Sequence, residues 1–183
     1  MAADEKLVGR YLEELYRWNK KVNLTSVARD KAQAVLIEPS LAMAEFFPPG
    51  NALEIFDIGS GGGLPAIPLA IRYLQHRFTL VESDRKKSIF LQHAASLLGL
   101  KNVRVLNERS EKISQDPAYA AIADVVTSRA VKREDVFSAA GGLLKPAGRV
   151  IIHHTPDAPE EFGGYRLFGK NPSADCFTRA PSI

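Results

Sequence analysis

A cluster of glycines that directly follows an apolar run constrains the fold of this chain more than any other feature. Residues 53–58 read LEIFDI, and glycine occupies four of the five positions 59–63, which read GSGGG. Glycine loses more conformational freedom on folding than any other residue, so this is a costly way to build a plain turn. Glycines let the backbone approach a ligand closely, and the start of a following helix offers free N–H groups. We therefore expect a strand, a ligand-binding loop and a helix that begins near Pro65.

Short apolar runs alternate with longer helical patterns after the Pro-Pro-Gly sequence at 48–50. This alternation is typical of βαβ units around a parallel sheet, and it predicts a doubly wound, Rossmann-like α/β fold. The last stretch, 155–183, is either partly disordered or contains an antiparallel hairpin of 165–168 with 176–179. The expected strands are 52–58, 78–82, 103–106, 125–128 and 149–153, and the expected helices are 65–74, 86–98 and 135–144.

The segment before the Pro-Pro-Gly sequence has a helical pattern. The sequence NLTS at 23–26 separates a first helix from a second one over 31–46, which Pro39 kinks or restarts. We expect a helical extension over residues 1–47 and one compact α/β unit over residues 48–183. The apolar stripe of the first helix consists of Leu7, Tyr11, Leu15 and Trp18. Because Trp18 continues this stripe, we expect it to be a core residue.

Composition excludes several classes of protein. With 183 residues, 45% hydrophobic and 25% charged, the chain has the profile of a soluble protein of about one domain. No apolar run approaches the roughly 18 residues of a membrane span, and the opening residues contain no apolar signal core, so we expect a cytoplasmic protein. The single cysteine, Cys176, excludes an internal disulfide and a cysteine-based zinc site. A net charge of +3 permits an anionic partner without requiring one.

The glycine loop also limits the choice of ligand. The dinucleotide fingerprint needs a third glycine where this chain has Leu64, and the Lys-Ser/Thr ending of a P-loop is absent. The remaining pattern, Gly-x-Gly-x-Gly preceded by Asp57, resembles the first motif of S-adenosylmethionine-dependent methyltransferases. That motif requires an acidic residue at the end of the next strand for the ribose hydroxyls, and Glu82 stands there, 25 positions later. A ligand-free turn and a nicotinamide cofactor stay open as alternatives.

Four stretches resemble one family. They are WNKKVNLTS (18–26), GSGGGLPAIPLAI (59–71), RKK with FL (85–91) and VVTSRA (125–130). Together they are similar to the bacterial small-subunit ribosomal RNA guanine-N7 methyltransferases, also called glucose-inhibited division protein B, and the resemblance covers residues 11–152. It implies S-adenosylmethionine as methyl donor and N7 of a guanine in 16S ribosomal RNA as acceptor. Because this nitrogen has a free lone pair, the reaction needs alignment of the reacting atoms and no general base.

The glycine motif and the resemblance together predict the site residues. Ser110 and Glu111, which follow the strand at 103–106, are expected beside the adenine. Arg129 is expected at the carboxyl end of a strand, facing both cofactor and substrate, and is the one candidate catalytic residue. The full set of expected cofactor contacts is Asp57, Gly59, Ser60, Gly61, Gly63, Leu64, Glu82, Ser110, Glu111 and Arg129.

The predicted RNA contacts are basic or polar residues outside the glycine loop. Each basic cluster on its own is ordinarily a solvated helix face, but phosphate contacts would make binding fall steeply with salt. The expected partner is 16S rRNA or the small ribosomal subunit, and the protein is expected to be a monomer. We expect no metal site, because adjacent His153 and His154 point to opposite faces of a strand. The substrate-binding candidates are Asn23, Arg85, Lys86 and His153, with Arg17, Lys20, Lys21, Lys87, Lys132 and Arg133 as further basic residues.

Two stretches depart from the family pattern. Residues 35–41 read VLIEPSL and lack the usual Arg-His pair and aspartate, for which Glu38 is a partial substitute. His153-His154 stands where the family has Lys-Gly. These departures lie where RNA would be held, so three alternatives stay open: a degenerate member that binds cofactor or RNA without transferring a methyl group, a methyltransferase for a smaller substrate, and a nicotinamide oxidoreductase.

Overall fold

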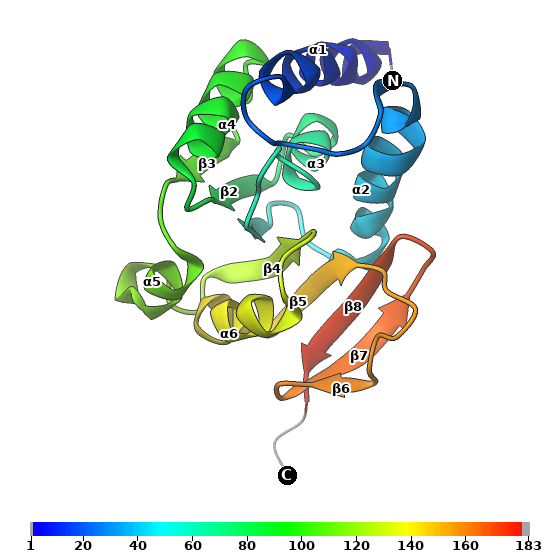
Figure 1. Cartoon of the computed structure of the whole chain (residues 1–183). Helices are drawn as coiled ribbons and strands as arrows, with labels where there is room; N and C mark the ends of the chain where they lie inside the picture. Colours follow the sequence, from blue (N-terminus) through cyan, green and yellow to red (C-terminus); the bar gives the residue numbers. More distant parts are fainter. Residues whose placement is uncertain (1, 181–183) are drawn as a thin grey trace.

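A mixed sheet of eight strands forms the centre of the computed structural model, which describes residues 2–180, with side chains from residue 4 onward (Figure 1). The strand order is β3-β2-β1-β4-β5-β8-β7-β6. The first five strands in this order pair in parallel, and β8 then joins β5 in the antiparallel sense. The strands are β1 (Glu54–Ile58), β2 (Arg77–Val81), β3 (Val103–Leu106), β4 (Ala123–Ser128), β5 (Leu144–His153), β6 (Glu161–Phe162), β7 (Tyr165–Lys170) and β8 (Ala174–Arg179).

Helices cover both faces of this sheet. Successive residues of a strand point to opposite faces, so Ile55 packs in one hydrophobic cluster with α1, α3 and α4, whereas Phe56 packs in a second cluster with α6. Within residues 2–180, none of the helices has both the length and the apolar character of a membrane span. The α-helices are α1 (Ala2–Asn19), α2 (Glu38–Ala42), α3 (Ala66–Arg72), α4 (Arg85–Leu97), α5 (Ser110–Gln115) and α6 (Arg133–Leu143). The 3-10 helices are η1 (Arg29–Lys31), η3 (Met43–Phe46) and η4 (Pro117–Tyr119), and η2 (Gln33–Ile37) is a π-helix.

The structure confirms the predicted doubly wound α/β fold. Every predicted strand and helix after the Pro-Pro-Gly sequence is present. Most of their ends differ from the predicted ends by a few residues, and the start of β5 differs by five. The hairpin of the last stretch is confirmed as β7 and β8. Helix α5 was not predicted as an element, because six residues carry too little periodic pattern to be identified.

The N-terminal helix α1 packs on α3 and α4, which in turn cover the sheet. Tyr11 and Leu15 of α1 are fully buried in the same cluster as Phe90 of α4, and the Trp18 ring lies 5.7 Å from the Phe90 ring, centroid to centroid. Trp18 is therefore partly buried and packs against the core, in agreement with its place in the stripe. The second predicted helix is divided into η2, α2 and η3, and Pro39 lies in the first turn of α2, where it restarts the helix. The division of the chain at residues 47 and 48 stays a prediction, and one hydrophobic cluster spans both segments.

The strand order places the site. The chain proceeds outward from β1 through β2 to β3, and then returns to the other side of β1 for β4 and β5. The connections therefore leave β1 and β4 in opposite directions, and ligands of such sheets bind in the crevice at the carboxyl ends of these two strands.

Candidate functional site

The glycine loop leaves β1 and lies across the end of β2. The backbone N–H groups of Gly59 and Ser60 donate to the Val81 carbonyl oxygen, with N···O distances of 2.9 and 3.1 Å. Gly59, Gly61 and Gly63 have φ angles of +67°, +53° and +88°, in the left-handed region that residues with a side chain rarely adopt. The N–H groups of Gly59 and Ser60 are therefore already paired with β2, and the N–H group of Gly61 is paired with Glu82.

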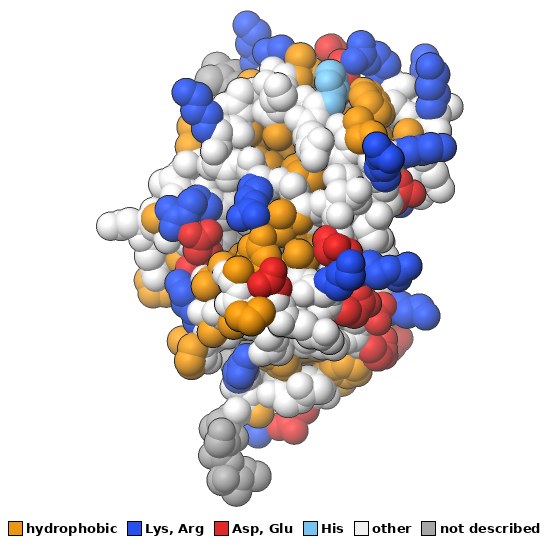
Figure 2. All heavy atoms as spheres, turned by 90° about the vertical axis from the view of Figure 1, so that its left-hand side faces the viewer, with side chains coloured by type: hydrophobic (Ala, Val, Ile, Leu, Met, Phe, Trp, Pro, Cys, Tyr) orange, Lys and Arg blue, Asp and Glu red, His pale blue; other side chains and the backbone are white. Residues whose placement is uncertain are grey.

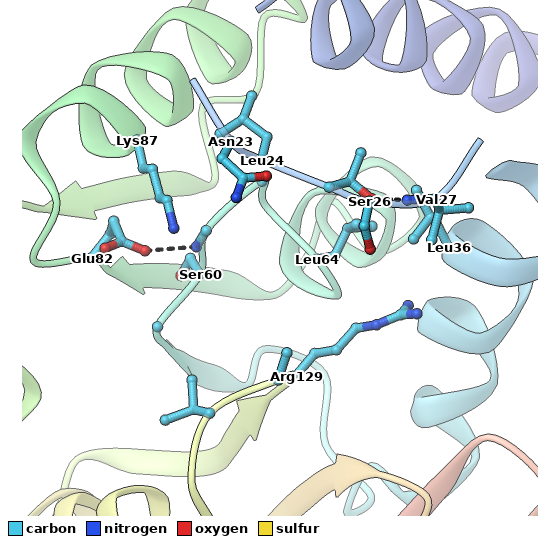
Figure 3. A pocket seen from close by; sticks show the side chains of 16 residues that line it. Asn23, Leu24, Ser26, Val27, Leu36, Ser60, Leu64, Glu82, Lys87 and Arg129 are labelled. Atoms are coloured by element: carbon cyan, nitrogen blue, oxygen red, sulfur yellow. Dashed lines mark hydrogen bonds between the residues drawn. The ribbon is translucent and has the colours of Figure 1, made fainter. Parts of the chain in front are cut away.

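A cavity of about 590 Å³ opens above this loop at the carboxyl ends of β1 and β4 (Figure 3). Seven of the predicted site residues line it, so the tertiary structure brings together positions between 23 and 129 of the chain. These seven are Asn23, Gly59, Ser60, Gly61, Leu64, Glu82 and Arg129, and the other lining residues are Leu24, Thr25, Ser26, Val27, Leu36, Gly62, Lys87, Ala130 and Val131.

The carboxylate of Glu82 joins the glycine loop to β2. Its Oε2 atom accepts a hydrogen bond from the Gly61 N–H at 2.8 Å, and its Oε1 atom accepts one from the Asp84 N–H at 2.8 Å. The side chain lines the cavity although the residue is only 6% exposed. Since a carboxylate has about four acceptor positions, lone pairs remain for hydroxyl groups of a ligand.

Asp57 lies beneath the cavity and does not line it. Its Oδ1 atom accepts a hydrogen bond from the Thr127 hydroxyl at 2.8 Å, and its buried Oδ2 atom has no hydrogen-bond partner in the described part of the chain. Burial raises the pKa of this carboxyl to about 7, because the charged form loses its hydration. Asp57 thus lies within the sheet and not in the cavity wall, so the cavity lining does not support its prediction as a direct cofactor contact. Gly63, which was also predicted to contact the cofactor, does not line the cavity either. A Cβ atom there would lie 2.6 Å from Cγ1 of Ile67, so this glycine serves close packing.

Arg129 follows the last residue of β4 and faces two cavities. Its Nη2 atom donates to the carbonyl oxygen of Val35 in η2 at 2.9 Å, and burial lowers the pKa of the half-buried guanidinium. Ala130 has a φ of +61°, a strained conformation for a residue with a Cβ atom. Strain of this kind is held in place by surrounding structure and is concentrated at functional sites.

Ser110 and Glu111 line a smaller cavity of about 200 Å³ beside the first one. Gly59 and Val131 line both cavities, and a Cβ atom at Gly59 would lie only 2.4 Å from Cγ2 of Val131. The two cavities therefore meet at the first glycine of the loop. This position agrees with the expectation that Ser110 and Glu111 flank one end of the cofactor, whose contacts stay a prediction.

The predicted substrate-binding residues are distributed over different parts of the structure. His153 lies at the end of β5 and lines a third cavity with Arg129, while Arg85 and Lys86 are exposed at the start of α4 and line none of these cavities. Their proposed contacts with RNA remain predictions. Lys87 lines the first cavity instead. Its helical phase with the buried Phe90, Leu91 and Ala94 was a signal in the sequence, because residues three, four and seven apart share a helix face.

The segment 20–28 forms one wall of the first cavity. Asn19 fixes its shape, since its Oδ1 atom accepts from the N–H groups of Leu24 and Thr25 and its Nδ2 atom donates to the Thr25 carbonyl oxygen. Tyr16 donates through its hydroxyl to the Val27 carbonyl oxygen at 2.8 Å. The contacts of residues 24–27 with the cavity were not predicted, although these residues belong to the WNKKVNLTS stretch.

On the face that Figure 2 draws, charge does not mark one binding site. On the side shown in Figure 2, lysine and arginine side chains are spread over several parts of the surface and mixed with acidic ones. In the described part of the chain, no cluster of three His, Cys, Asp or Glu residues is suited to a metal ion. His153 lines a cavity, whereas His154, which lies just beyond the end of β5, pairs with Asp175.

Comparison with known proteins identifies relatives over most of the chain. The family profile of GidB, the rRNA small subunit methyltransferase G, matches residues 4–163. The ribosomal RNA small subunit methyltransferase G of Polynucleobacter asymbioticus is 40% identical over 157 residues, which cover 82% of this chain and 69% of the relative. The protein of the same name from Oceanobacillus iheyensis is 38% identical and covers 82% of this chain and 64% of its own length. This chain thus spans about two thirds of the length of these relatives.

Solved structures share the fold at low sequence identity. A SAM-dependent methyltransferase from Aquifex aeolicus superposes with a TM-score of 0.57 at 16% identity, over 80% of this chain and 90% of the other. A candidate S-adenosyl-L-methionine-dependent methyltransferase from Methanococcus maripaludis gives a TM-score of 0.63 at 14% identity, over 84% and 91%. At this identity the likeness concerns the fold alone.

Proposed function

The chain belongs to the rRNA small subunit methyltransferase G family, and we propose that it transfers a methyl group from S-adenosylmethionine to N7 of a guanine in 16S ribosomal RNA. The single observation that supports this most strongly is the convergence of the glycine loop, Glu82 and Arg129 on one cavity at the point where the strand order reverses. Fold-level likeness alone would leave the function open, since one fold serves many activities.

The residues of the site fit the proposed cofactor. The open space at Gly61, where a Cβ atom would meet only the Gly59 carbonyl oxygen at 3.7 Å, leaves room for a ligand against the loop backbone. Glu82 offers carboxylate lone pairs to the ribose hydroxyls, and the adjoining cavity at Ser110 and Glu111 offers a place for the adenine. The two adjoining cavities, of about 590 and 200 Å³, together fall within the size range of pockets that bind small molecules.

In the proposed reaction, the protein's own side chains mainly have to bind and orient the reactants. Bound S-adenosylmethionine supplies an activated methyl group, so alignment of the acceptor is the main requirement. Arg129 carries only hydrogen-bond donors and therefore orients a ligand without accepting a proton. The guanine gains positive charge as it reacts, and the carboxylate of Glu82 lies in the wall of the same cavity.

Transfer of a labelled methyl group to small ribosomal subunits that lack the modification tests this function. We expect label in 16S rRNA that is recovered as 7-methylguanosine, and we expect Gly61→Arg to remove the activity by filling the cavity. Cofactor binding without transfer to any RNA would instead indicate a degenerate member of the family. Label in another nucleoside or in a small molecule would indicate a different substrate.

The proposal includes the setting in which the protein acts. The names of the relatives point to a ribosomal substrate, which supports a cytoplasmic location. We propose that the protein acts as a monomer, because a single chain by itself supplies the glycine loop, Glu82 and Arg129 of the cavity wall. Light scattering on the purified protein measures the mass in solution, and a dimer would contradict this part of the proposal.

A further inference from the structure

We propose that a third cavity, next to the cofactor cavity, binds a phosphate group of the nucleotide whose base accepts the methyl group. This inference rests on the proposed function and assigns Arg133 and Thr155 to the same site. The cavity has a volume of about 460 Å³ and shares Arg129, Ala130 and Val131 with the first cavity. Its lining residues are Ser128, Arg129, Ala130, Val131, Arg133, Ile152, His153 and Thr155.

The chemistry of this lining selects an anion. It contains two guanidinium groups, an imidazole and two hydroxyls, and it contains no carboxylate. Burial, followed by the nearby Arg129, lowers the pKa of His153, which favours the neutral imidazole. The positive charge of the cavity therefore comes from Arg129 and Arg133, and planar guanidinium groups match the geometry of phosphate oxygens.

The position of Arg133 is fixed from beneath by a buried network. Asp175 is fully buried on β8, where its Oδ1 atom pairs with Nδ1 of His154 at 2.7 Å and its Oδ2 atom accepts from the Thr155 N–H at 3.1 Å. The Thr155 hydroxyl in turn accepts a hydrogen bond from Nη2 of Arg133 at 2.6 Å. The guanidinium also lies 6.0 Å from the centroid of the Phe162 ring.

This network has two consequences for a ligand. The Asp175 carboxylate is fully buried, accepts hydrogen bonds on both oxygens and is not part of the cavity lining, so it does not compete with a ligand for that space. Arg133 uses one N–H for Thr155 and has five in total, so further donors remain for a phosphate. Holding the guanidinium in place before binding also reduces the entropy cost of the contact.

The first experiment compares guanosine 5′-monophosphate with guanosine as ligands of the protein saturated with S-adenosylhomocysteine, by calorimetry. We expect the wild type to bind the phosphorylated nucleoside about tenfold more tightly, the scale of one hydrogen bond to a charged group. Arg133→Gln should remove this preference and leave the affinity for S-adenosylhomocysteine unchanged. Arg166→Gln, which removes an equivalent charge from an exposed residue of β7 paired with Glu161, should keep the preference.

A second variant separates a structural defect from the loss of a contact. Thr155→Val removes the hydroxyl that accepts from Arg133 but keeps the charge, so we expect the preference to fall partly, with an unchanged circular dichroism spectrum. Equal binding of the two ligands by the wild type, including no binding of either, overturns the proposal, and so does an undiminished preference in Arg133→Gln. Methyl transfer to small subunits is assayed separately. Transfer without a phosphate preference contradicts only this inference, whereas a preference without transfer contradicts only the proposed function.

Discussion

The hydroxyl of Tyr11 in the first helix donates a hydrogen bond of 2.7 Å to the carbonyl oxygen of Gly62 in the glycine loop. Tyr11 is fully buried, and burial raises its pKa, so the hydroxyl stays protonated and remains a donor. A Cβ atom at Gly62 would lie 3.1 Å from Cδ1 of Leu15 and 3.1 Å from the Leu24 carbonyl oxygen. The N-terminal segment therefore packs tightly against the loop that lines the proposed cofactor cavity.

Tyr11→Phe should destabilise the protein and weaken cofactor binding together. The variant leaves a buried carbonyl without its partner, which costs about 1–3 kcal/mol of the free energy of unfolding. Urea denaturation measures that loss, and calorimetry measures the Kd of S-adenosylmethionine, which we expect to rise severalfold. Tyr119→Phe is the matched control, since its hydroxyl meets only the exposed Arg104 on another part of the sheet. Equal effects of the two variants would show that the contact with Gly62 has no special role.

A pair of substitutions at Gly61 separates bulk from backbone strain. The φ of +53° penalises any side chain by roughly 1–2 kcal/mol, but a Cβ atom at this position meets only open space and one oxygen at 3.7 Å. Gly61→Ala should therefore retain S-adenosylmethionine binding within about tenfold, whereas Gly61→Arg should lose it at any ligand concentration up to millimolar. Calorimetric titration of both variants checks this. Binding by the arginine variant would show that the cofactor does not lie against this loop.

Asp57 should make the protein less stable as the pH rises from about 4 to about 7. The pKa of this carboxyl is raised from its usual value of 3.8 to about 7, so in that window the folded protein holds a proton that the unfolded chain has already lost. The free energy of unfolding should therefore decrease by about 1.4 kcal/mol per pH unit from this group, and by about 4 kcal/mol across the window. Below pH 4 both states are protonated, and above pH 7 both are ionised, so the contribution levels off at each end.

Urea denaturation of the wild type and of Asp57→Asn between pH 4 and 8 isolates this group from other titrating residues. Asparagine can still accept the hydrogen bond of the Thr127 hydroxyl but cannot ionise. The variant should be the more stable protein at pH 8, and the difference should vanish near pH 4. A constant difference over the whole range would mean that Asp57 is ionised throughout.

Glu82→Gln should weaken S-adenosylmethionine binding by about tenfold or more. The carboxylate accepts backbone N–H groups on both oxygens, from Gly61 and Asp84, whereas the amide has one accepting oxygen and directs its own N–H groups at the other donor. The loop should lose its fixed shape, and the ribose hydroxyls should lose their acceptor. Glu54→Gln serves as control, because Glu54 begins β1 at the end of the strand that lies away from the glycine loop. This variant should keep the wild-type Kd for S-adenosylmethionine under the same conditions. No change in Kd for Glu82→Gln would remove this residue from the cofactor site.

Much of the site was predictable because its signals are local. The strand, the glycine loop and Glu82 belong to successive elements of one βαβ unit, and the geometry of that unit alone brings them together at one edge of the sheet. Arg129 was predicted from the family resemblance of the TSRA stretch, and the structure places it directly after β4, which pairs with β1 on its other side. Lys87 was predicted only as one of the further basic residues and not as a cavity residue, although helical phase distinguishes it from Arg85 and Lys86 once Asp84 is recognised as the N-cap of α4.

The sequence by itself determined the order of the elements, the positions of the turns and the type of loop, because these depend on residues that are near one another in the chain. Tertiary structure alone decided that Asp57 is sealed in the sheet against Thr127, and that residues 24–27 form a wall of the cavity. It also decided that Arg133 is held by Thr155 above the buried Asp175. These three outcomes depend on burial and on contacts between distant segments, which packing settles only when the whole sheet and its covering helices have assembled.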